Sequence, residues 1–256
     1  MKVEGTGAIV VGGASGLGEA TVRALHARGA HVTVADVNAE KGEALVSELG
    51  DDARFAPCDV REEEQVKAAM EGVAEASEDG LRISICCAGV GWPEKIAGGR
   101  GPHQLQPFET VLAINLVGTF NALRFAAATM LANEPWDSGE RGVCVNTASI
   151  AAFDGQVGQV AYSASKGGIV GLTLPAARDL ADKGIRVNTI APGTFDTPLL
   201  ALLPQDQKDA LAAGIPFPKR LGDPAEFAAL AVHIVENQAL NGETIRLDGA
   251  LRMPPR

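Results

Sequence analysis

The stretch VVGGASGLGE, residues 10–19, decides the fold of this 256-residue chain. It begins at the end of an apolar run that is typical of a buried strand, contains glycines at 12, 13, 16 and 18, and ends in an amphipathic helical pattern. Glycine permits a tight turn and a close approach of the backbone to a bound group, while the start of a helix offers free N–H groups and a positive dipole end. The glycine turn alone is a weak signal, but strand, turn and helix in this order predict dinucleotide binding.

Short apolar runs alternate with helical patterns along the rest of the chain. The expected strands are residues 8–11, 31–35, 54–57, 83–87, 142–147, 185–190 and 244–247. The expected helices are residues 17–27, 40–49, 62–75, 108–131, 162–181 and 226–235. Strands that alternate with helices form right-handed crossovers to a parallel sheet. We therefore expect an α/β fold: a single doubly wound, Rossmann-like parallel sheet with helices on both faces and a ligand crevice at the carboxyl ends of its strands.

The chain length suits one domain over residues 1–256. Three loops interrupt the regular alternation, at residues 91–106, 133–141 and 194–223. Loops of this length in a compact domain are usually functional. We expect the last one to be a substrate lid, called the lid segment below, with a short helix around 205–213. Its leucines either cover an apolar substrate or pack as the core of a short helix: Leu199, Leu200, Leu202 and Leu203.

The composition excludes some classes of binding partner and indicates the cellular compartment. The formal net charge is -10 and the isoelectric point is about 4.9, so an acidic surface disfavours nucleic acid. No signal peptide and no apolar run near the ~20 residues of a membrane span is evident, which predicts a cytoplasmic protein with no membrane partner. The cysteines lack metal-site or disulfide spacing, so we expect no metal and buried free thiols: Cys58, Cys86, Cys87 and Cys144.

The sequence YSASK, residues 162–166, carries the candidate proton-transfer group. Residues four apart share one helix face, so the phenol of Tyr162, the only tyrosine, lies beside the ammonium of Lys166. A nearby cation favours the phenolate and makes a phenol a usable proton shuttle. Alone, such a pair is usually a solvated helix face. Thirteen residues earlier, however, Ser149 closes a strand with a hydroxyl that can donate to a carbonyl oxygen in the same crevice.

Three further positions fit a dinucleotide site. Asp36 ends the second strand 18 residues beyond Gly18, where a carboxylate accepts ribose hydroxyls and repels the 2′-phosphate of NADP; the alternative is a helix N-cap. Asp59 can bind the adenine amino group while Val60 packs on the ring, although Asp is also a common cap. Asn115 interrupts an apolar helical run, so its amide is either satisfied locally or anchors a buried water.

These pieces together resemble the short-chain dehydrogenase/reductase family over essentially the whole chain. The residues that carry the resemblance, in the family's order and spacing, are the glycine turn, Asp36, Asp59, Asn115, Ser149, Tyr162, Lys166, Pro192 and Gly193. A closer resemblance is to the type II 3-hydroxyacyl-CoA dehydrogenase branch, which also oxidises hydroxysteroids. It rests on residues 12–18, 133–135, 146–152, 156–159, 161–171, 216–224 and 241–250, and on the insert at 91–106. Two departures are Val11 in place of a frequent Thr and Cys86 in place of a frequent Asn.

The resemblance implies a role for each motif residue. Tyr162 is the general acid/base, Lys166 supports it and holds the nicotinamide ribose, Ser149 positions the substrate oxygen, and Asn115 supports a proton-relay water. Ser149 and Tyr162 bind the substrate. The implied cofactor-binding residues are Gly12, Ser15, Gly16, Leu17, Gly18, Asp36, Asp59, Val60, Cys87, Ala88, Gly89, Tyr162, Lys166, Pro192, Gly193, Phe195 and Thr197.

The resemblance also implies the reaction. We expect NAD-dependent interconversion of a secondary alcohol and a ketone, with L-3-hydroxyacyl-CoA as the first substrate candidate. A hydroxysteroid, a 3-oxoacyl-acyl-carrier-protein and a non-catalytic dinucleotide-binding scaffold are the alternatives. A homotetramer is expected, with helices 108–131 and 162–181 paired across one interface and residues 247–255 at another.

Overall fold

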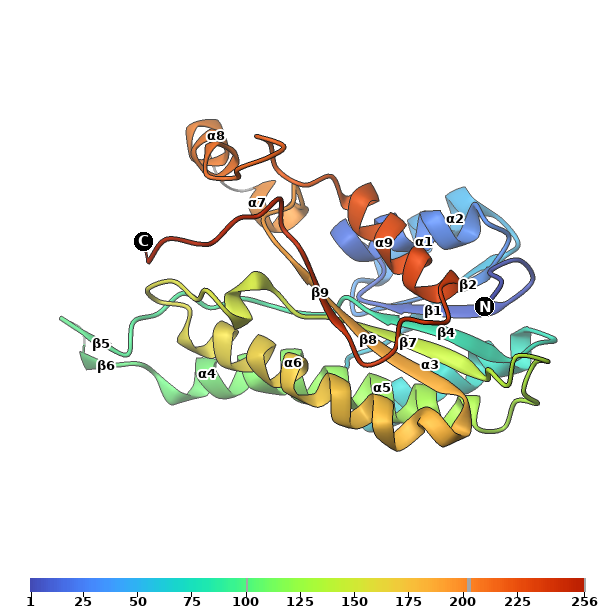
Figure 1. Cartoon of the computed structure of the whole chain (residues 1–256). Helices are drawn as coiled ribbons and strands as arrows, with labels where there is room; N and C mark the ends of the chain where they lie inside the picture. The colour runs from blue at the N-terminus through green and yellow to red at the C-terminus, as the bar shows by residue number, and fades with distance from the viewer. Residues whose placement is uncertain (100, 202–203, 256) are drawn as a thin grey trace.

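At the centre of the computed structural model, which describes residues 1–99, 101–201 and 204–255, lies a seven-stranded sheet of order β3-β2-β1-β4-β7-β8-β9 (Figure 1). Every pair of neighbouring strands in it is parallel, as the alternating pattern predicts. The order reverses between β1 and β4, which places the expected ligand crevice beside the glycine turn. The strands are β1 Gly7–Val11, β2 His31–Asp36, β3 Ala53–Pro57, β4 Leu81–Cys86, β7 Gly142–Thr147, β8 Ile185–Pro192 and β9 Thr244–Leu247.

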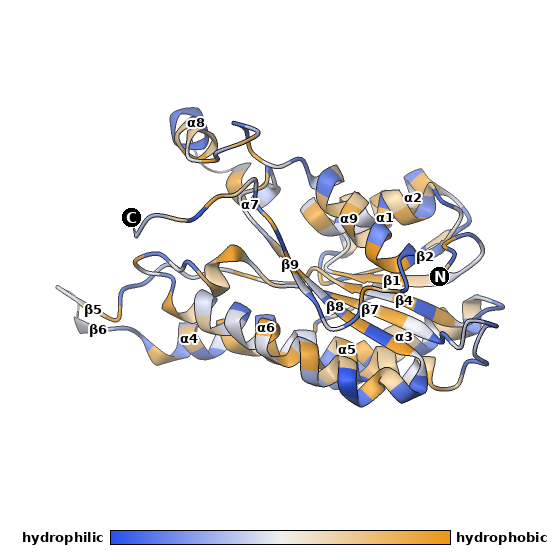
Figure 2. Ribbon diagram, viewed as in Figure 1, coloured by the Kyte–Doolittle hydropathy of each residue, from blue (hydrophilic) through white to orange (hydrophobic). Residues whose placement is uncertain are grey.

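Helices cover both faces of the sheet, which confirms the doubly wound fold (Figure 1). One face carries α1 Gly16–His26, α2 Ala39–Leu49 and α9 Pro224–Glu236. The other carries α3 Glu63–Ala76, α4 Leu105–Leu112, α5 Gly118–Met130 and α6 Val160–Leu180. Successive side chains of a strand point to opposite faces, so Val10 joins one core cluster while Ile9 and Val11 join the other. Figure 2 shows these apolar strands between the helical layers.

The remaining short elements lie in the loops. The insert at 91–106 contains a two-stranded antiparallel ladder, β5 Ala97–Gly98 and β6 Gly101–Pro102. A 3-10 turn, η2 Ile150–Ala152, follows β7, and a second, η3 Ala181–Lys183, follows α6. The lid segment contains α7 Pro198–Ala201 and α8 Gln205–Ala213, close to the predicted helix at 205–213.

The helix predicted over 108–131 differs from the prediction in two ways. It begins earlier, at Leu105, and a π-helical turn, η1 Ala113–Val117, separates α4 from α5. The turn contains Asn115, whose amide binds the backbone of Val90, and π-turns inside helices frequently mark functional sites.

By length and apolar composition the whole helix, Leu105–Met130, would pass as a membrane span, contrary to the expectation from the sequence. Half of its apolar window is buried in the fold.

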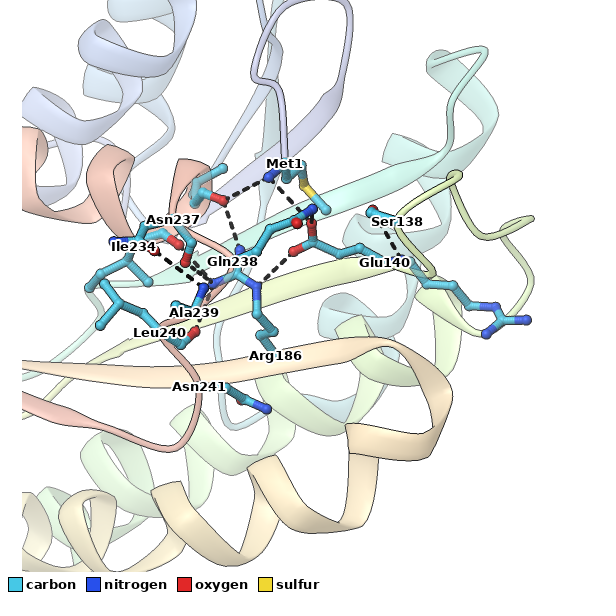
Figure 3. Close-up of polar contacts among 12 residues, drawn as sticks. Met1, Ser138, Glu140, Arg186, Ile234, Asn237, Gln238, Ala239, Leu240 and Asn241 are labelled. Carbon is cyan, nitrogen blue, oxygen red and sulfur yellow. Dashed lines mark hydrogen bonds and ion pairs between the residues drawn. The ribbon is translucent and has the colours of Figure 1, made fainter.

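A buried ion pair lies at the start of β8, beside the end of α9 (Figure 3). Arg186, at the start of β8, donates through Nε to Glu140 Oε1 at 2.7 Å, and both side chains are under 10% exposed. Glu140 also accepts from Gln238 at 2.9 Å and lies 3.3 Å from the amino group of Met1. The last carbonyls of a helix have no hydrogen-bond donor within the helix. At the end of α9 the remaining N–H groups of the Arg186 guanidinium act as donors. They donate to the carbonyls of Ile234, Val235, Asn237 and Leu240.

Candidate active site

The glycine turn folds as its residue types require. Gly12 has φ +75°, in the left-handed region that favours glycine. A Cβ at Gly18 would overlap the carbonyl oxygen of Gly12, so the helix can start this close to the strand only with glycine there. Ser15 is the N-cap of α1, yet its side chain makes no capping bond. The turn therefore presents a hydroxyl and the first N–H groups of a helix to the space in front of it.

That space is a cleft of about 410 Å³ at the carboxyl ends of the strands. Its lining contains every predicted cofactor residue except Gly193 and Phe195. Eight further residues line the cleft and are not indicated by the motifs: Val37, Cys58, Arg61, Val90, Ile114, Thr147, Ala148 and Pro198. Most of them directly precede or follow a predicted residue, so continuity along the chain was the signal that could have found them.

Asp36 is tied to the glycine turn. Its carboxylate accepts from the backbone N–H of Ala14 at 3.0 Å through Oδ2 and from that of Asn38 at 2.9 Å through Oδ1. The N-cap alternative is wrong, because Asn38 caps α2 by accepting from the N–H of Lys41 at 3.0 Å. The carboxylate of Asp36 therefore brings a negative charge to the wall of the cleft and steadies the turn.

Asp59 is paired with a residue that the motifs did not indicate. Arg61 donates through Nε to both carboxylate oxygens of Asp59, at 3.0 and 3.1 Å. The hydrogen bond from this guanidinium lowers the pKa of Asp59. Asp59 is thus held ionised, and both residues line the cleft. Val60, which also lines it, is buried against Gly118, where a Cβ would overlap the valine side chain.

Tyr162 and Lys166 lie one turn apart near the start of α6, as predicted. The Lys166 ammonium is 5.7 Å from the centroid of the Tyr162 ring and donates to the carbonyl of Thr147 at 2.8 Å. Lys166 is only 3% exposed, whereas Tyr162 is half-buried and lines the cleft. The arrangement is a phenol open to the cleft with a buried cation behind it, which is what a phenolic proton shuttle needs.

Asn115 connects Val90, the residue before the insert, to the helix that carries Tyr162. Its Oδ1 accepts from the N–H of Val90 at 2.8 Å, and its Nδ2 donates to the carbonyl of Val90 at 2.9 Å and to the hydroxyl of Ser165 at 3.0 Å. Ser165 in turn donates to the carbonyl of Tyr162 at 2.7 Å. Of the two interpretations left open by the sequence, local satisfaction of the amide is the one observed.

Ser149 follows directly on two lining residues, Thr147 and Ala148, but is not itself part of the lining. It is 8% exposed and caps the 3-10 turn η2 by accepting from the N–H of Ala151 at 3.1 Å. The structure thus places Ser149 just after β7 beside the cleft, and among the described residues its hydroxyl hydrogen has no acceptor.

The sequence of this chain matches a known protein family over most of its length. The pattern of the family described as short chain dehydrogenase matches residues 6–208. The chain belongs to the short-chain dehydrogenase family. It is therefore an oxidoreductase. It is 52% identical to the 3-hydroxyacyl-CoA dehydrogenase type-2 of Homo sapiens, with 99% of this chain and 98% of that protein covered. The protein of the same name from Drosophila melanogaster is also 52% identical, with 96% and 97% covered.

A solved structure agrees. The crystal structure of 3-hydroxyacyl-CoA dehydrogenase type-2 from Mycobacterium avium superposes with a TM-score of 0.95, at 48% identity and with 98% of each chain covered. The resemblance found in the sequence, to the short-chain dehydrogenases and to their type II 3-hydroxyacyl-CoA branch, is thereby confirmed. The α/β fold of this short-chain dehydrogenase is confirmed in the same way.

Two predicted cofactor residues of this short-chain dehydrogenase lie away from the cleft lining. The side chain of Phe195 is 7% exposed and packs edge-on against Phe227, with ring centroids 6.5 Å apart. Gly193 packs against Asp248, where a Cβ would come within 2.9 Å of the aspartate Cα. The side chain of Phe195 belongs to the core because apolar burial outweighs exposure at the cleft, and a role at the cofactor stays a prediction for both residues.

Cys86, where the family frequently has Asn, lies beside a buried amide group that lacks a hydrogen-bond partner among the described residues. Cys86 is the register partner of Asn146 on the neighbouring strand, and the side-chain Nδ2 of Asn146 is buried without a hydrogen-bond partner among the described residues. The thiol lies 3.7 Å from the hydroxyl of Thr119 instead. All four cysteines are free, and burial raises the pKa of Cys58, Cys87 and Cys144 to about 12. These thiols are therefore neutral and are not nucleophiles at physiological pH.

The lid segment begins at the cleft and then leaves it. Thr197 and Pro198 line the cleft beside Gly16, whereas α8 stands apart from the body of the fold and buries none of its side chains (Figure 1). Of the four leucines predicted to cover a substrate, Leu200 is partly buried. The prediction for the other three, Leu199, Leu202 and Leu203, lies outside the described residues or side chains. Within the described part of the chain, no group of three or more His, Cys, Asp or Glu could hold a metal.

Proposed function

We propose that this short-chain dehydrogenase interconverts a secondary alcohol and a ketone with NAD, and that its substrate is an L-3-hydroxyacyl-CoA. The observation that carries the proposal is the set of Asp36, Tyr162 and Lys166 around one cleft beside the glycine turn. The choice of substrate is supported by relatives near 50% identity over almost the full chain, each named a 3-hydroxyacyl-CoA dehydrogenase.

The cleft fits NAD by residue type. The glycine turn and the start of α1 would hold the pyrophosphate, since a Cβ at Gly12 or Gly18 would overlap neighbouring backbone. Asp36 would accept the hydroxyls of the adenosine ribose, and its charge disfavours the 2′-phosphate of NADP. Asp59 and Val60 would meet the adenine, and the remaining lining residues, Cys87, Ala88, Gly89, Pro192 and Thr197 among them, would enclose the rest. When bound, the nicotinamide supplies the hydride acceptor, or the donor in reverse.

The chain's own residues would manage the proton. In the direction of oxidation, Tyr162 as phenolate would remove the proton of the substrate hydroxyl. The ammonium of Lys166, fixed by the carbonyl of Thr147, compensates the negative charge of the phenolate. Ser149 donates a hydrogen bond to the substrate oxygen and would stabilise the charge that develops there in the reverse reaction.

Asn115 would act through position rather than contact with the substrate. Its bonds to Val90 and Ser165 hold the residue before the insert against α6 at the level of Tyr162. A proton-relay water supported by Asn115 remains part of the proposal.

A substrate panel tests the proposal. Purified protein would be mixed with NAD and with short, medium and long L-3-hydroxyacyl-CoA, the D isomers, a hydroxysteroid and a 3-hydroxyacyl-acyl-carrier-protein, and NADH fluorescence would be followed. We expect turnover of the L-3-hydroxyacyl-CoA compounds and a lower kcat/KM for the others. The proposal fails if no L-3-hydroxyacyl-CoA is oxidised, and turnover of the steroid or the carrier-protein thioester alone would favour those alternatives. NAD binding without turnover of any alcohol would favour the scaffold.

We also propose a cytoplasmic homotetramer. Its support is apolar surface on the paired long helices: Val117 is 57% exposed, Phe120 53%, Leu131 46% and Leu174 44%. Large apolar side chains that are exposed on helices would be covered in such an assembly. Light scattering that gives a monomer would contradict the tetramer, and recovery of the protein with membranes after cell fractionation would contradict the location.

A further inference from the structure

The C-terminal segment, residues 248–255, touches both the loop after Ser149 and the lid segment (Figure 1). On the loop side, the side chain of Gln156 donates to the carbonyl of Pro254 at 3.0 Å, and the N–H of Val157 donates to the carbonyl of Pro255 at 3.0 Å. In the interior, the buried Leu251 packs in one cluster with Ile150 and Ile215. Ile150 directly follows Ser149, and Ile215 lies in the lid segment. The C-terminal segment is thus the layer between them.

Arg246, the third residue of β9, organises this layer. Its Nε donates to Asp248 at 2.8 Å, and one terminal nitrogen donates to Asp154 at 2.5 Å and to the carbonyl of Leu251 at 3.0 Å. Its guanidinium also lies 5.1 Å from the centroid of the Phe153 ring. One side chain therefore binds the loop after Ser149 and both ends of the turn at residues 248–251.

That turn is tight and depends on the charge of Asp248. The carboxylate is 7% exposed and accepts from Arg246, from Arg252 at 3.2 Å and from the N–H of Ala250 at 3.0 Å. Ala250 has φ +65° and is the only non-glycine residue with positive φ in the described part of the chain. Gly249 has φ +59°, and a Cβ there would come within 2.7 Å of Ile215. A residue held in an unfavourable backbone region requires surrounding contacts that fix it.

The link from Arg246 back to Ser149 is a continuous set of short bonds. Asp154 donates its N–H to the carbonyl of Ile150 at 2.9 Å, and Ala152 donates its N–H to the carbonyl of Ser149 at 3.0 Å. The hydroxyl of Ser149 accepts from Ala151 at 3.1 Å. Anchoring Asp154 therefore fixes the turn whose N-cap is Ser149.

We propose that Arg246 is a positioning residue, which holds the loop after Ser149 and the Ile215 end of the lid segment against the C-terminal segment so that the alcohol substrate is correctly placed. The proposal rests on the proposed role of Ser149 and not on acyl-CoA as the substrate. None of the described side-chain contacts of Arg246 involves a residue that lines the cleft, so we expect the Kd of NAD to change little when Arg246 is replaced.

The variant R246M tests this with any alcohol that the wild type oxidises. We expect the KM of the alcohol to rise at least tenfold and kcat to fall, while the Kd of NAD stays within twofold. R246K, which keeps the charge but not the fork of N–H donors, should recover part of the KM. The matched control is R23M, because Arg23 also joins two carboxylates, those of Glu19 and Glu48, far along the chain from Ser149. R23M should leave every constant unchanged.

Hydrogen exchange supplies a readout that needs no turnover. In R246M the amides of residues 150–154 and 249–251 should exchange at least tenfold faster than in the wild type, with α1 unchanged. Should R246M not fold, D154N removes the charge of the same pair and makes the same predictions. Unchanged KM and unchanged exchange in the folded variants would overturn the proposal, and so would a parallel loss of NAD binding. If the wild type oxidises no alcohol, the proposed function fails, while the exchange data still decide whether Arg246 fixes the loop.

Discussion

Replacing Asp36 by Asn should weaken the preference for NAD over NADP by about 10²- to 10³-fold. Asparagine keeps the size of the side chain but removes the negative charge and one acceptor. In the structure both carboxylate oxygens are used, one by the N–H of Ala14 at 3.0 Å and one by that of Asn38 at 2.9 Å. The side-chain NH₂ of Asn cannot accept from either donor, and a hydrogen bond to a charged group contributes about 1.5–3 kcal/mol. Binding of both cofactors should therefore weaken.

The preference itself depends on the charge. A carboxylate about 5 Å from the 2′-phosphate repels each unit of its charge by about 3 kcal/mol at an effective dielectric constant near 20, and 1.4 kcal/mol corresponds to a factor of about ten. D36N removes this repulsion for NADP and removes the ribose acceptor for NAD, so the two effects act in the same direction on the ratio. The loss of the bond to Ala14 affects both cofactors and cancels.

Initial rates with each cofactor give kcat/KM for NAD and for NADP in the wild type and in D36N. The matched control is D52N, because Asp52 is an exposed carboxylate paired with His31 at 2.9 Å outside the cleft lining. It should leave the ratio unchanged. A wild type that prefers NADP would refute the reasoning, and so would a ratio for D36N within threefold of the wild type.

Three further predictions concern the phenol, the buried ion pair and the thiols. Y162F should lower kcat by at least 10³-fold with Tm unchanged, because the hydroxyl transfers the proton but does not stabilise the fold; equal kcat in rapid-mixing kinetics would contradict this. E140Q should lower the free energy of unfolding by about 3 kcal/mol and Tm by about 6–12 °C, because it leaves the buried Arg186 uncompensated, whereas E48Q at an exposed pair should change Tm by less than about 2 °C in calorimetry. The pKa of the Cys144 thiol is raised from 9.0 to about 12, so its contribution to stability is complete below pH 9 and is lost as pH rises from 9 to 12. In urea unfolding between pH 9 and 10.5, C144A should therefore lose stability less steeply than the wild type, by up to about 1.4 kcal/mol per pH unit, and equal slopes would show that this thiol is not responsible.

The sheet could be predicted because its signal is local and repeated. Each strand is a short apolar run bounded by turn residues, and every expected strand is present with ends shifted by at most two residues. The π-turn at Asn115 could not be predicted, because it depends on a bond between this amide and the backbone of Val90, 25 residues away in the sequence. The pattern of apolar residues continues through the turn, so it indicated one uninterrupted helix.

The residues of the candidate site also fall into those that the sequence could predict and those that it could not. Asp36, Tyr162 and Lys166 contribute through side chains whose chemistry can be read from residue type and spacing. Thr147 contributes a carbonyl oxygen to Lys166, a group that every residue possesses and that no sequence pattern distinguishes. Arg61 binds Asp59 two residues away, but an exposed Arg near an Asp is common and therefore carries little information.

The burial of Lys166 connects fold and function. An ammonium that is 3% exposed is costly unless it is paired, and among the described residues its hydrogen-bond partner is the neutral carbonyl of Thr147, with no carboxylate in an ion pair with it. Stability alone would favour an apolar side chain at this position. A negative charge nearby would offset this cost, and the phenol of Tyr162, whose ring centroid is 5.7 Å from the ammonium, is a group of the cleft that can provide one. In the proposed reaction, the proton that Tyr162 takes from the alcohol leaves from a position beside this buried cation, which connects the cost in stability to the proposed chemistry.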